Sequence, residues 1–445
     1  MNKKKIISSL FLTTALVAST IAASPAATFA ASSRLGGADR YETSAKISQN
    51  GWANGSDYVV LASGEGYADA LCAAPIAKKY NAPILLTTSK TLNSTIKSEI
   101  IRLKAKNVIE IGGPASISSN IENQLENEMS LKVTRLGGTD RYETSANVAR
   151  ELGDVSDMVL TSGIGYADAL SIAPIAASEG YPILLTPKNS VTNSVKSYIN
   201  SHRSDSTKVY VVGGSGVIPE STLSSVPSPM RIFGQNRYET NLSVMEFFKS
   251  DLKLSNIYIA KGDGPNGNEF ADALSASALA AQTSSPVVLT NNALNSSTQE
   301  FIKSNFTKDT NIVSIGGQAS VSDSLVTTIQ NVINGTDETQ NPPTSGGGGG
   351  SSSSSNSQLI SAVNSIKDIK GLNSSQQAVV DSMVNIVEKH SSDANYDYKN
   401  DSEVASVKNK YESLSENDKT GLKNAIQSVL SISEILELGN QFGLI

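Results

Sequence analysis

The stretch that decides the fold is Arg-Leu-Gly-Gly-Ala-Asp-Arg-Tyr-Glu-Thr-Ser-Ala at residues 34–45. The chain repeats it at 135–146 with a single exchange, Thr139 for Ala38, and more loosely at 231–242. The third copy keeps both arginines and the whole Arg-Tyr-Glu-Thr core. A phrase that returns at so regular an interval marks an internal repeat, so the chain contains copies of one unit.

Three other phrases recur in the same order, which extends the repeat from a short motif to whole domains. They are Tyr-Ala-Asp-Ala-Leu at 67–71 (again at 166–170 and, with Phe first, at 270–274), Pro-Ile-Leu-Leu-Thr at 83–87 (again at 182–186 and, with valines, at 286–290) and Gly-Gly at 112–113 (again at 213–214 and 316–317). Three homologous units therefore cover residues 34–335.

Apolar runs alternate with stretches of helical periodicity inside each unit. Short buried strands separated by helices indicate βαβ units with a parallel sheet. The expected fold is α/β, with three tandem parallel-sheet repeats that each have their own core. In the first unit the pattern predicts strands at 58–62, 84–87, 108–111 and 132–134, and helices at 68–80, 93–104 and 118–128.

Changes in composition predict the domain organisation. The three units are expected at 31–131, 132–230 and 231–335. A Pro/Gly/Ser-rich linker is expected at 336–357, where the composition is that of a flexible tether. Helical periodicity returns at 358–445 and predicts a small all-α module, whose function and partner the sequence does not identify.

The first residues have the order of a secretory signal. Lysines at 3–5 precede an apolar stretch at 6–23, and small residues follow up to Ala30. We expect 1–30 to be a signal peptide and the mature chain to be exported, with no membrane insertion after cleavage. An uncleaved anchor is the alternative, but no later segment has the roughly 18 unbroken apolar residues of a membrane span.

Composition argues against several classes of function. The net charge of -6 includes the lysines of the signal, so the mature chain is more acidic still and a poor partner for nucleic acid. His202 and His390 are the only histidines and Cys72 the only cysteine, so we expect neither a metal site nor a cofactor. Ser171 and Ser275 stand where Cys72 stands, which favours a small buried residue over a nucleophile. We assign no catalytic residue.

Arginine occurs at two fixed places in every unit of a chain that otherwise prefers lysine. The planar guanidinium, with its five donors, suits carboxylate or phosphate better than a point charge does. The second place also falls in the first turn of a predicted helix, where anions are favoured. Internal salt bridges, such as Arg40 to Asp69 of the same or a neighbouring repeat, are the alternative. The two roles are compatible if the arginines line junctions between repeats. The six candidates are Arg34, Arg135 and Arg231 at the first place and Arg40, Arg141 and Arg237 at the second.

Two sets of acidic residues recur with the arginines. Asp39 followed by Glu42 directly before a helical run is a capping box, so we expect these carboxylates to start a helix, as their counterparts in the other units do. Asp69, Asp168 and Asp272 follow glycine-bearing loops after the first strand of each unit. Ligands of parallel sheets commonly bind beyond strand C-termini, so these three are structural or belong to a ligand loop.

The ordered motifs resemble the clostridial cell-wall-binding repeat 2 family over residues 34–335. The resemblance implies that three repeats pack around a pseudo-threefold axis and hold a secreted protein noncovalently on the Gram-positive cell wall, where surface-layer proteins also lie. It implies an anionic wall polymer as the partner. The residues it implicates are the recurring arginines, the tyrosines Tyr41, Tyr142 and Tyr238, and the apolar segments Ile84, Leu85, Leu86, Ile183, Leu184 and Leu185.

The third repeat departs from this pattern at several positions, so its site is expected to be weaker or altered. Phe233 replaces a glycine, Asn236 an aspartate, Phe270 a tyrosine and Ala278 a proline.

We therefore expect a noncatalytic anchor at the cell surface that displays a C-terminal helical module. A wall hydrolase with an unrecognised site and a structural surface-layer protein are the alternatives. The anchor is favoured because the distinctive residues come in threes, whereas a catalytic centre needs only one.

Overall fold

The computed structural model describes residues 30–263, 270–336, 360, 362–367, 369–390, 396, 402–427, 429–430, 438 and 442. Apart from Ala30 and Thr336, the predicted signal peptide and linker lie outside the described residues. No helix in the described part of the chain is both long and apolar enough to cross a membrane.

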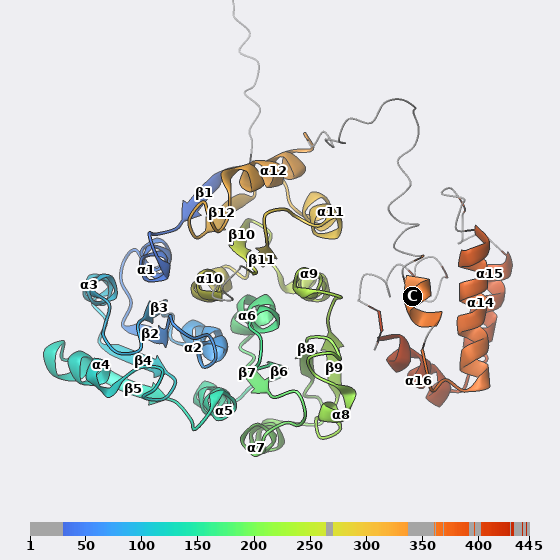
Figure 1. The fold of residues 1–445 in the computed structure, drawn as a ribbon, viewed down its shortest axis with the longest axis horizontal. Helices are drawn as coiled ribbons and strands as arrows, with labels where there is room; N and C mark the ends of the chain where they lie inside the picture. Colours follow the sequence, from blue (N-terminus) through green and yellow to red (C-terminus); the bar gives the residue numbers. More distant parts are fainter. Residues whose placement is uncertain are drawn as a thin grey trace, which may run out of the picture.

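Residues 30–263 and 270–336 form three α/β units around a pseudo-threefold axis, which confirms the expected fold class (Figure 1). Each unit has one sheet of four parallel strands, and the predicted strands of the first unit are all present. The sheet orders are β3-β2-β4-β5, β7-β6-β8-β9 and β11-β10-β12-β1. The strands are β1 (Ser32–Leu35), β2 (Tyr58–Ser63), β3 (Ile84–Thr87), β4 (Asn107–Ile111), β5 (Lys132–Leu136), β6 (Met158–Ser162), β7 (Ile183–Thr186), β8 (Val209–Val212), β9 (Pro229–Ile232), β10 (Asn256–Lys261), β11 (Val287–Thr290) and β12 (Asn311–Ile315).

The strand that carries the first arginine of each repeat completes the sheet of the preceding unit. β5 pairs with β4, and β9 pairs with β8. β1 follows the same rule around the ring, because it pairs in parallel with β12 at the other end of the body. The first strand of the body therefore closes the ring on its last sheet.

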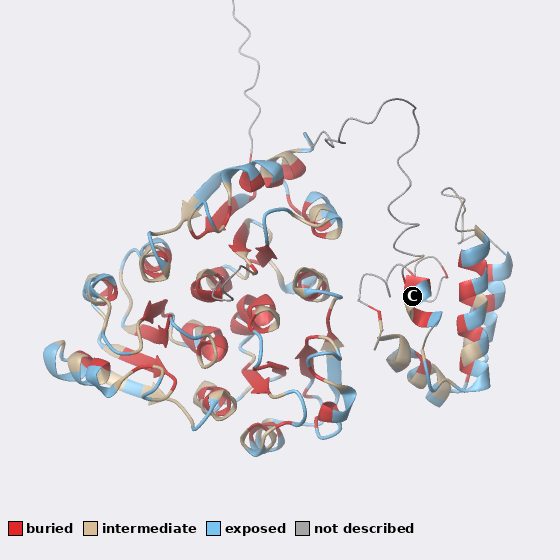
Figure 2. Cartoon of the chain, viewed as in Figure 1, coloured by how far each residue is buried: buried red, intermediate tan, exposed pale blue. Residues whose placement is uncertain are grey.

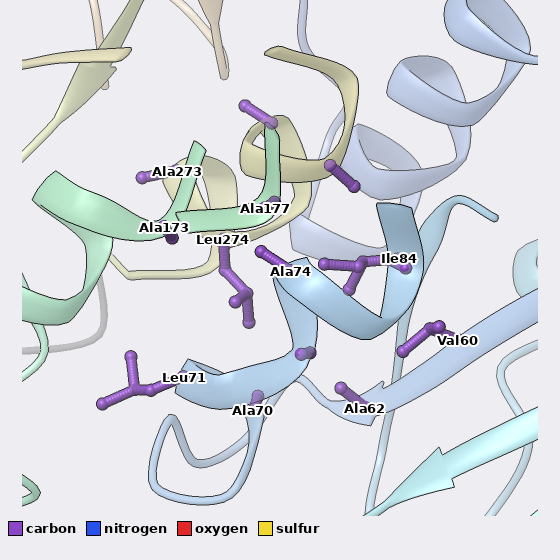
Figure 3. Close-up of a cluster of buried hydrophobic side chains, with 14 of the residues drawn as sticks. Val60, Ala62, Ala70, Leu71, Ala74, Ile84, Ala173, Ala177, Ala273 and Leu274 are labelled. Carbon is purple, nitrogen blue, oxygen red and sulfur yellow. The ribbon is translucent and has the colours of Figure 1, made fainter. Parts of the chain in front are cut away.

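Three helices from the three units meet at the axis and form the centre of the core (Figure 2). Alanines allow these helices to approach closely, and Ala74, Ala173 and Ala273 come from three different helices in one buried cluster (Figure 3). Close approach of small residues gains dispersion contacts along the whole helix, so the three units share a central core. The second and third units also have apolar clusters of their own. The central helices are α2 (Ala73–Lys79), α6 (Ala167–Glu179) and α10 (Phe270–Gln282).

The outer helices pack on the sheets and at the junctions. The first helix of each unit lies against the edge strand of its own sheet and also contacts the central helix of the preceding unit. These junction helices are α1 (Arg40–Gly51), α5 (Arg141–Leu152) and α9 (Arg237–Phe247). The other helices of the body are η1 (Ala70–Cys72), α3 (Ser94–Leu103), α4 (Ser119–Asn123), η2 (Gln124–Glu128), α7 (Asn193–His202), α8 (Glu220–Leu223), η3 (Lys249–Asp251), α11 (Ser296–Asn305) and α12 (Asp323–Asn334).

The helix predicted at 68–80 differs in its first turn from the counterpart in the second unit. It begins as the 3₁₀ turn η1 and becomes α-helical only at α2, whereas α6 is continuous. The side-chain hydrogen bonds differ in the same way. The Cys72 thiol donates to the carbonyl oxygen of Asp69, three residues back. The Ser171 hydroxyl donates to the carbonyl oxygen of Ala167, four residues back. A spacing of three residues is that of a 3₁₀-helix, and a spacing of four is that of an α-helix.

The C-terminal module is helical, as its periodicity predicts. Its described helices pack around a separate apolar core that includes Val363, Met383 and Leu422. The Ser415 hydroxyl accepts a bond from the backbone N–H of Asp418 at 3.1 Å and so caps α16 at its start. The helices are α14 (Ser374–His390), α15 (Ser402–Glu412) and α16 (Glu416–Gln427).

Candidate junction site

The junction helices start at capping boxes, as the sequence predicts. Asp39 accepts a bond from the backbone N–H of Glu42 at 2.8 Å, and Glu42 accepts one from that of Ala38 at 2.7 Å. The bond from Ala38, with help from Lys46, holds the pKa of Glu42 below its usual value. Asp140 and Asn236 cap α5 and α9 in the same way. These capping side chains satisfy free helix N–H groups and are occupied by that task.

The first arginine of each repeat, here called a strand arginine, is bound within the protein. Its Nη1 donates to the carbonyl oxygen of the first glycine in the Gly-Gly pair of the preceding unit. Its Nη2 pairs with a carboxylate of that same unit. The internal salt bridges considered from sequence therefore exist at this place. The pairs are Arg34 with Gly316 (3.0 Å) and Asp323 (2.7 Å), Arg135 with Gly112 (3.0 Å), Glu122 (2.9 Å) and Glu110 (2.5 Å), and Arg231 with Gly213 (2.6 Å) and Glu220 (2.7 Å).

The second arginine of each repeat, here called a helix arginine, is held differently. One guanidinium nitrogen donates to a glycine carbonyl of its own unit, and the guanidinium carbon lies over an aromatic ring of the preceding unit. No helix arginine forms an ion pair within 4.0 Å of another described residue. The contacts are Arg40 with Gly64 (2.5 Å) and Phe270 (5.6 Å), Arg141 with Gly163 (2.6 Å) and Tyr67 (5.9 Å), and Arg237 with Gly262 (2.8 Å) and Tyr166 (5.7 Å).

The three rings under the helix arginines form one cluster on the pseudo-threefold axis. The centroids of Tyr67 and Tyr166 are 5.4 Å apart, those of Tyr67 and Phe270 5.7 Å, and those of Tyr166 and Phe270 6.2 Å. The Tyr67 hydroxyl also donates to the carbonyl oxygen of Ile164 in the second unit, at 2.5 Å. A ring face attracts a cation, so this aromatic triad fixes the three guanidinium groups around the axis.

The recurring aspartates lie beside the Gly-Gly pairs. The first glycine of each pair has a positive φ, 110° at Gly112, which an L side chain rarely adopts. The carboxylate of Asp69 occupies the space that a Cβ would take there and accepts a bond from the Ser116 hydroxyl at 2.5 Å. Asp272 is bonded to Ser320 in the same way. These aspartates therefore contact the Gly-Gly loop to which the strand arginines also donate hydrogen bonds.

Asp168 differs because Val217 stands where Ser116 and Ser320 stand. Burial raises the pKa of Asp168 to about 6, although the Arg237 charge opposes the change. The Arg40 charge likewise favours ionised Asp272, but burial still raises the pKa of that group. The electrostatic partner of Arg40 is thus Asp272 of the third unit, the counterpart of Asp69 in a neighbouring repeat.

Two clefts open where helix arginines meet the preceding unit. The cleft between the second and third units has a volume of about 830 Å³ and is lined by Asp168, Lys188, Val217, Phe233 and Arg237 among others. The cleft between the third and first units has a volume of about 410 Å³ and is lined by Asp39, Arg40, Lys261, Asp272 and Ser320 among others. Recurrence pointed to the arginines and aspartates. It could not point to Lys188 or Val217, which do not recur.

The other residues taken from the resemblance lie deeper. The ring of Tyr41 packs on Gly64, where an added Cβ would be 2.7 Å from the ring, and Tyr142 and Tyr238 repeat the contact. Burial, more than the nearby Asp263, raises the pKa of the Tyr238 phenol. The apolar segments in β3 and β7 are at most 1 % exposed, so a ligand on the surface does not reach their side chains. They are Ile84, Leu85, Leu86, Ile183, Leu184 and Leu185.

The single thiol is also internal. Cys72 is buried, as are Ser171 and Ser275 at the same place, and burial raises the pKa of the thiol. A raised pKa keeps the thiol protonated and unreactive. Within the described residues no group of three or more His, Cys, Asp or Glu could hold a metal ion.

Comparisons with known proteins agree with this architecture. The chain is 36% identical over 303 residues to N-acetylmuramoyl-L-alanine amidase LytC of Bacillus subtilis, covering 68% of this chain and 58% of that protein. It is 34% identical over 263 residues to the amidase enhancer of Bacillus subtilis, covering 58% of this chain and 34% of that one. The chain thus spans less than two thirds of the length of either relative.

Solved structures give the same result for the fold. Cwp6 from Clostridium difficile superposes with a TM-score of 0.65 at 27% identity, covering 83% of this chain and 62% of that one. Cwp8 from Clostridium difficile superposes with a TM-score of 0.62 at 29% identity, covering 68% and 52%. The profile of cell wall binding domain 2 matches residues 34–122, 135–223 and 231–326, one match for each unit. The chain therefore belongs to the cell wall binding domain 2 family.

Proposed function

We propose that the three-unit body anchors this chain noncovalently to the Gram-positive wall by binding an anionic wall polymer at its unit junctions. Membership of a wall-binding family supports the location at the wall. The anionic nature of the ligand is our inference from the helix arginines. On this proposal the chain is exported, and the helical module at 358–445 is displayed beyond the wall for a partner of its own.

The observation that carries the proposal is the state of Arg40, Arg141 and Arg237. Each uses one nitrogen for a glycine carbonyl and rests on a ring, without a described carboxylate within ion-pair distance. A guanidinium has five N–H donors, so most of them stay available. All three are half-buried, which strengthens a charge-assisted bond to phosphate or carboxylate.

The repetition of the site favours a polymer over a small ligand. A chain molecule that engages one junction is held close to the next, so the linked contacts raise its effective concentration without any new interaction. The aromatic triad keeps the three guanidinium groups around one axis, which makes their separation fixed. Three moderate sites on a rigid body then give retention that one unit alone lacks.

The test is cosedimentation of residues 30–445 with purified Gram-positive walls, before and after chemical removal of the anionic polymer. We expect the protein to sediment with intact walls and to stay in solution with stripped walls. A variant with Arg40, Arg141 and Arg237 all changed to Ala is expected to lose binding while keeping its melting temperature within a few degrees. Equal binding to stripped walls would make peptidoglycan or protein the ligand and refute the proposal.

The same preparation separates an anchor from a wall hydrolase. Release of soluble sugar or peptide from peptidoglycan during the incubation would support the hydrolase. We expect none, because the proposed site contains arginines and structural aspartates and no assigned nucleophile or general base.

A further inference from the structure

The two described clefts have different charges, although the repeat makes them equivalent. Arg40 and Lys261 face Asp39 and Asp272 across the cleft between the third and first units, so its described ionisable groups balance. Among the residues that the structure describes, Arg237 and Lys188 face one carboxylate, Asp168, across the cleft between the second and third units, because the capping residue there is the neutral Asn236. With all of these described groups ionised, the second–third cleft carries one net positive charge.

The same cleft has an apolar edge that the other lacks. Ile164 is 58% exposed and Val217 is 40% exposed, and both line it together with Phe233. At the third–first cleft the place of Val217 is taken by Ser320, and the place of Phe233 by Gly36. Large apolar side chains left exposed in a cleft beside polar groups are characteristic of a binding site for a small molecule.

Contacts within the body hold this edge in place. The Tyr67 hydroxyl bonds to the backbone of Ile164, so the first unit positions the loop that carries the apolar side chain. Phe233 replaces the glycine whose counterpart, Gly36, has no room for a Cβ against Gly316. The second–third junction must therefore leave more space between its backbones than the third–first junction does, because the Phe233 ring fits beside Gly214 there.

We propose that the second–third cleft is the main ligand site of the body and takes an anionic sugar, with the charged group at Arg237 and Lys188 and an apolar sugar face against Ile164 and Val217. This inference rests on the proposed polymer binding and deepens it. The departures of the third repeat from the family pattern then create the strongest site, whereas the sequence led us to expect a weaker one. A phosphate or a carboxylate on the sugar meets the same donors.

The experiment measures the affinity of residues 30–445 for four probes by ligand-observed NMR titration at fixed ionic strength. The probes are glucose 1-phosphate, glucuronic acid, glucose and inorganic phosphate. We expect one or both charged sugars to bind more tightly than glucose and inorganic phosphate, and the stronger of the two identifies phosphate or carboxylate. Inorganic phosphate binding as tightly as glucose 1-phosphate would overturn the proposal, and so would no binding of either charged sugar.

A reciprocal pair of substitutions tests which of the two clefts binds the charged sugar. Asn236→Asp adds a carboxylate to the second–third cleft, and Asp39→Asn removes one from the third–first cleft. Both residues are good helix caps, so both variants are expected to fold. We expect Asn236→Asp to weaken binding of the charged sugar about fivefold, as one added like charge at short range does in water, and Asp39→Asn to change it less than twofold. The opposite ranking would overturn the assignment.

A second pair tests the apolar edge. Val217→Ser and Ile164→Ser should each weaken the charged sugar about threefold and leave inorganic phosphate unchanged, since only the sugar meets these side chains. Equal losses for both probes would show that the edge does not contact sugar. If the cleft variants have no effect while walls still bind through their polymer, this inference fails and the anchor stands. If stripped walls bind equally well, the anchor fails whatever the probes do.

Discussion

The two rows of arginines are the same residue type in the same repeat, and the structure holds them in opposite ways. Each strand arginine is paired with a carboxylate: Arg231, for example, bonds to two carbonyl oxygens and to Glu220. The helix arginines keep most donors unused: Arg141 bonds to one carbonyl oxygen and lies over Tyr67. Recurrence in the sequence therefore marks two kinds of arginine: one that links neighbouring units and one that forms a candidate ligand site. Only the residues that each arginine contacts distinguish the two kinds.

The largest expected effect is on stability, from the loss of a strand arginine. Arg135→Ala leaves the buried carboxylate of Glu110 without the guanidinium opposite it, so we expect a loss of about 3 kcal/mol in the free energy of unfolding at pH 8. Arg141→Ala removes one bond and a ring contact and should cost about 1 kcal/mol. Urea unfolding of both variants measures the difference. Equal losses would mean that the two rows are not distinct.

The next effect is on binding, from the helix arginines. Changing Arg40, Arg141 and Arg237 together to Ala should lower affinity for intact walls on the order of 100-fold, because linked sites are lost at once. Changing all three to Lys keeps the charge but removes the planar fork, and should lower affinity about tenfold. Depletion of protein from solution by increasing amounts of wall gives both values. Full retention in the Lys variant would make charge alone sufficient.

A smaller effect concerns the pH dependence of stability that comes from Glu110, the buried carboxylate opposite the strand arginine Arg135. Glu110 is fully buried opposite Arg135, and burial raises its pKa to about 7 against the pull of the arginine. The folded state then holds this proton more tightly than the unfolded state does. The stability that this gives is full below pH 4.5 and is lost as the pH rises through about 7.

Glu110→Val should remove that part of the pH dependence. Val211 occupies the same place in the second unit, opposite Arg231, so a valine fits the strand, and Arg135 keeps Glu122 as a partner. The expected change at pH 7 is within about 1 kcal/mol. Unfolding free energies of the wild type and the variant at pH 5 and pH 8 supply the comparison. The same decline in both proteins would assign it to other groups, such as Glu246, whose pKa burial also raises to about 7.

The smallest expected effect is on the pH dependence of ligand binding beside the helix arginine Arg237, and it comes from Asp168. As the pH rises through about 6, its carboxyl group ionises beside Arg237, and an anion in the second–third cleft meets an added negative charge. Binding of glucose 1-phosphate should weaken about threefold between pH 5 and pH 7.5, beyond the change due to the probe's own ionisation. Asp168→Asn should bind with the same affinity at both pH values after that correction. A persistent decline in this variant would exclude Asp168 as its source.

Local features could be predicted from the sequence because their partners are neighbours in the chain. The capping box of Asp39 and Glu42 is complete within four residues, and the strand at 84–87 is identified by its apolar run. The buried place of Cys72 followed from the small residues at the same position in the other units.

The contacts of the candidate site could not be predicted from the sequence, because they form only when the three units close into a ring. Arg40 lies over Phe270, which comes from the other end of the body, and no spacing in the sequence connects them. The sequence left open whether Arg40 faces the aspartate of its own repeat, Asp69, or that of a neighbouring repeat, and the junction brings Asp272 there. The character of the second–third cleft depends on Lys188 and Val217, which only a comparison of the folded junctions singles out.

Closure of the ring by β1 sets an order of events during synthesis. Arg34 and its acceptor Gly316 are 282 residues apart, so β1 cannot pair within its own chain until β12 has been made and, on the proposed function, exported as well. For that time β1 is an unpaired strand with the unpaired edges that favour association with other chains. The last sheet of a second copy offers the same pairing edge, so closure within one chain competes with exchange of β1 between two chains. A low concentration of incompletely folded copies favours the closed monomer, and a high concentration favours exchanged dimers.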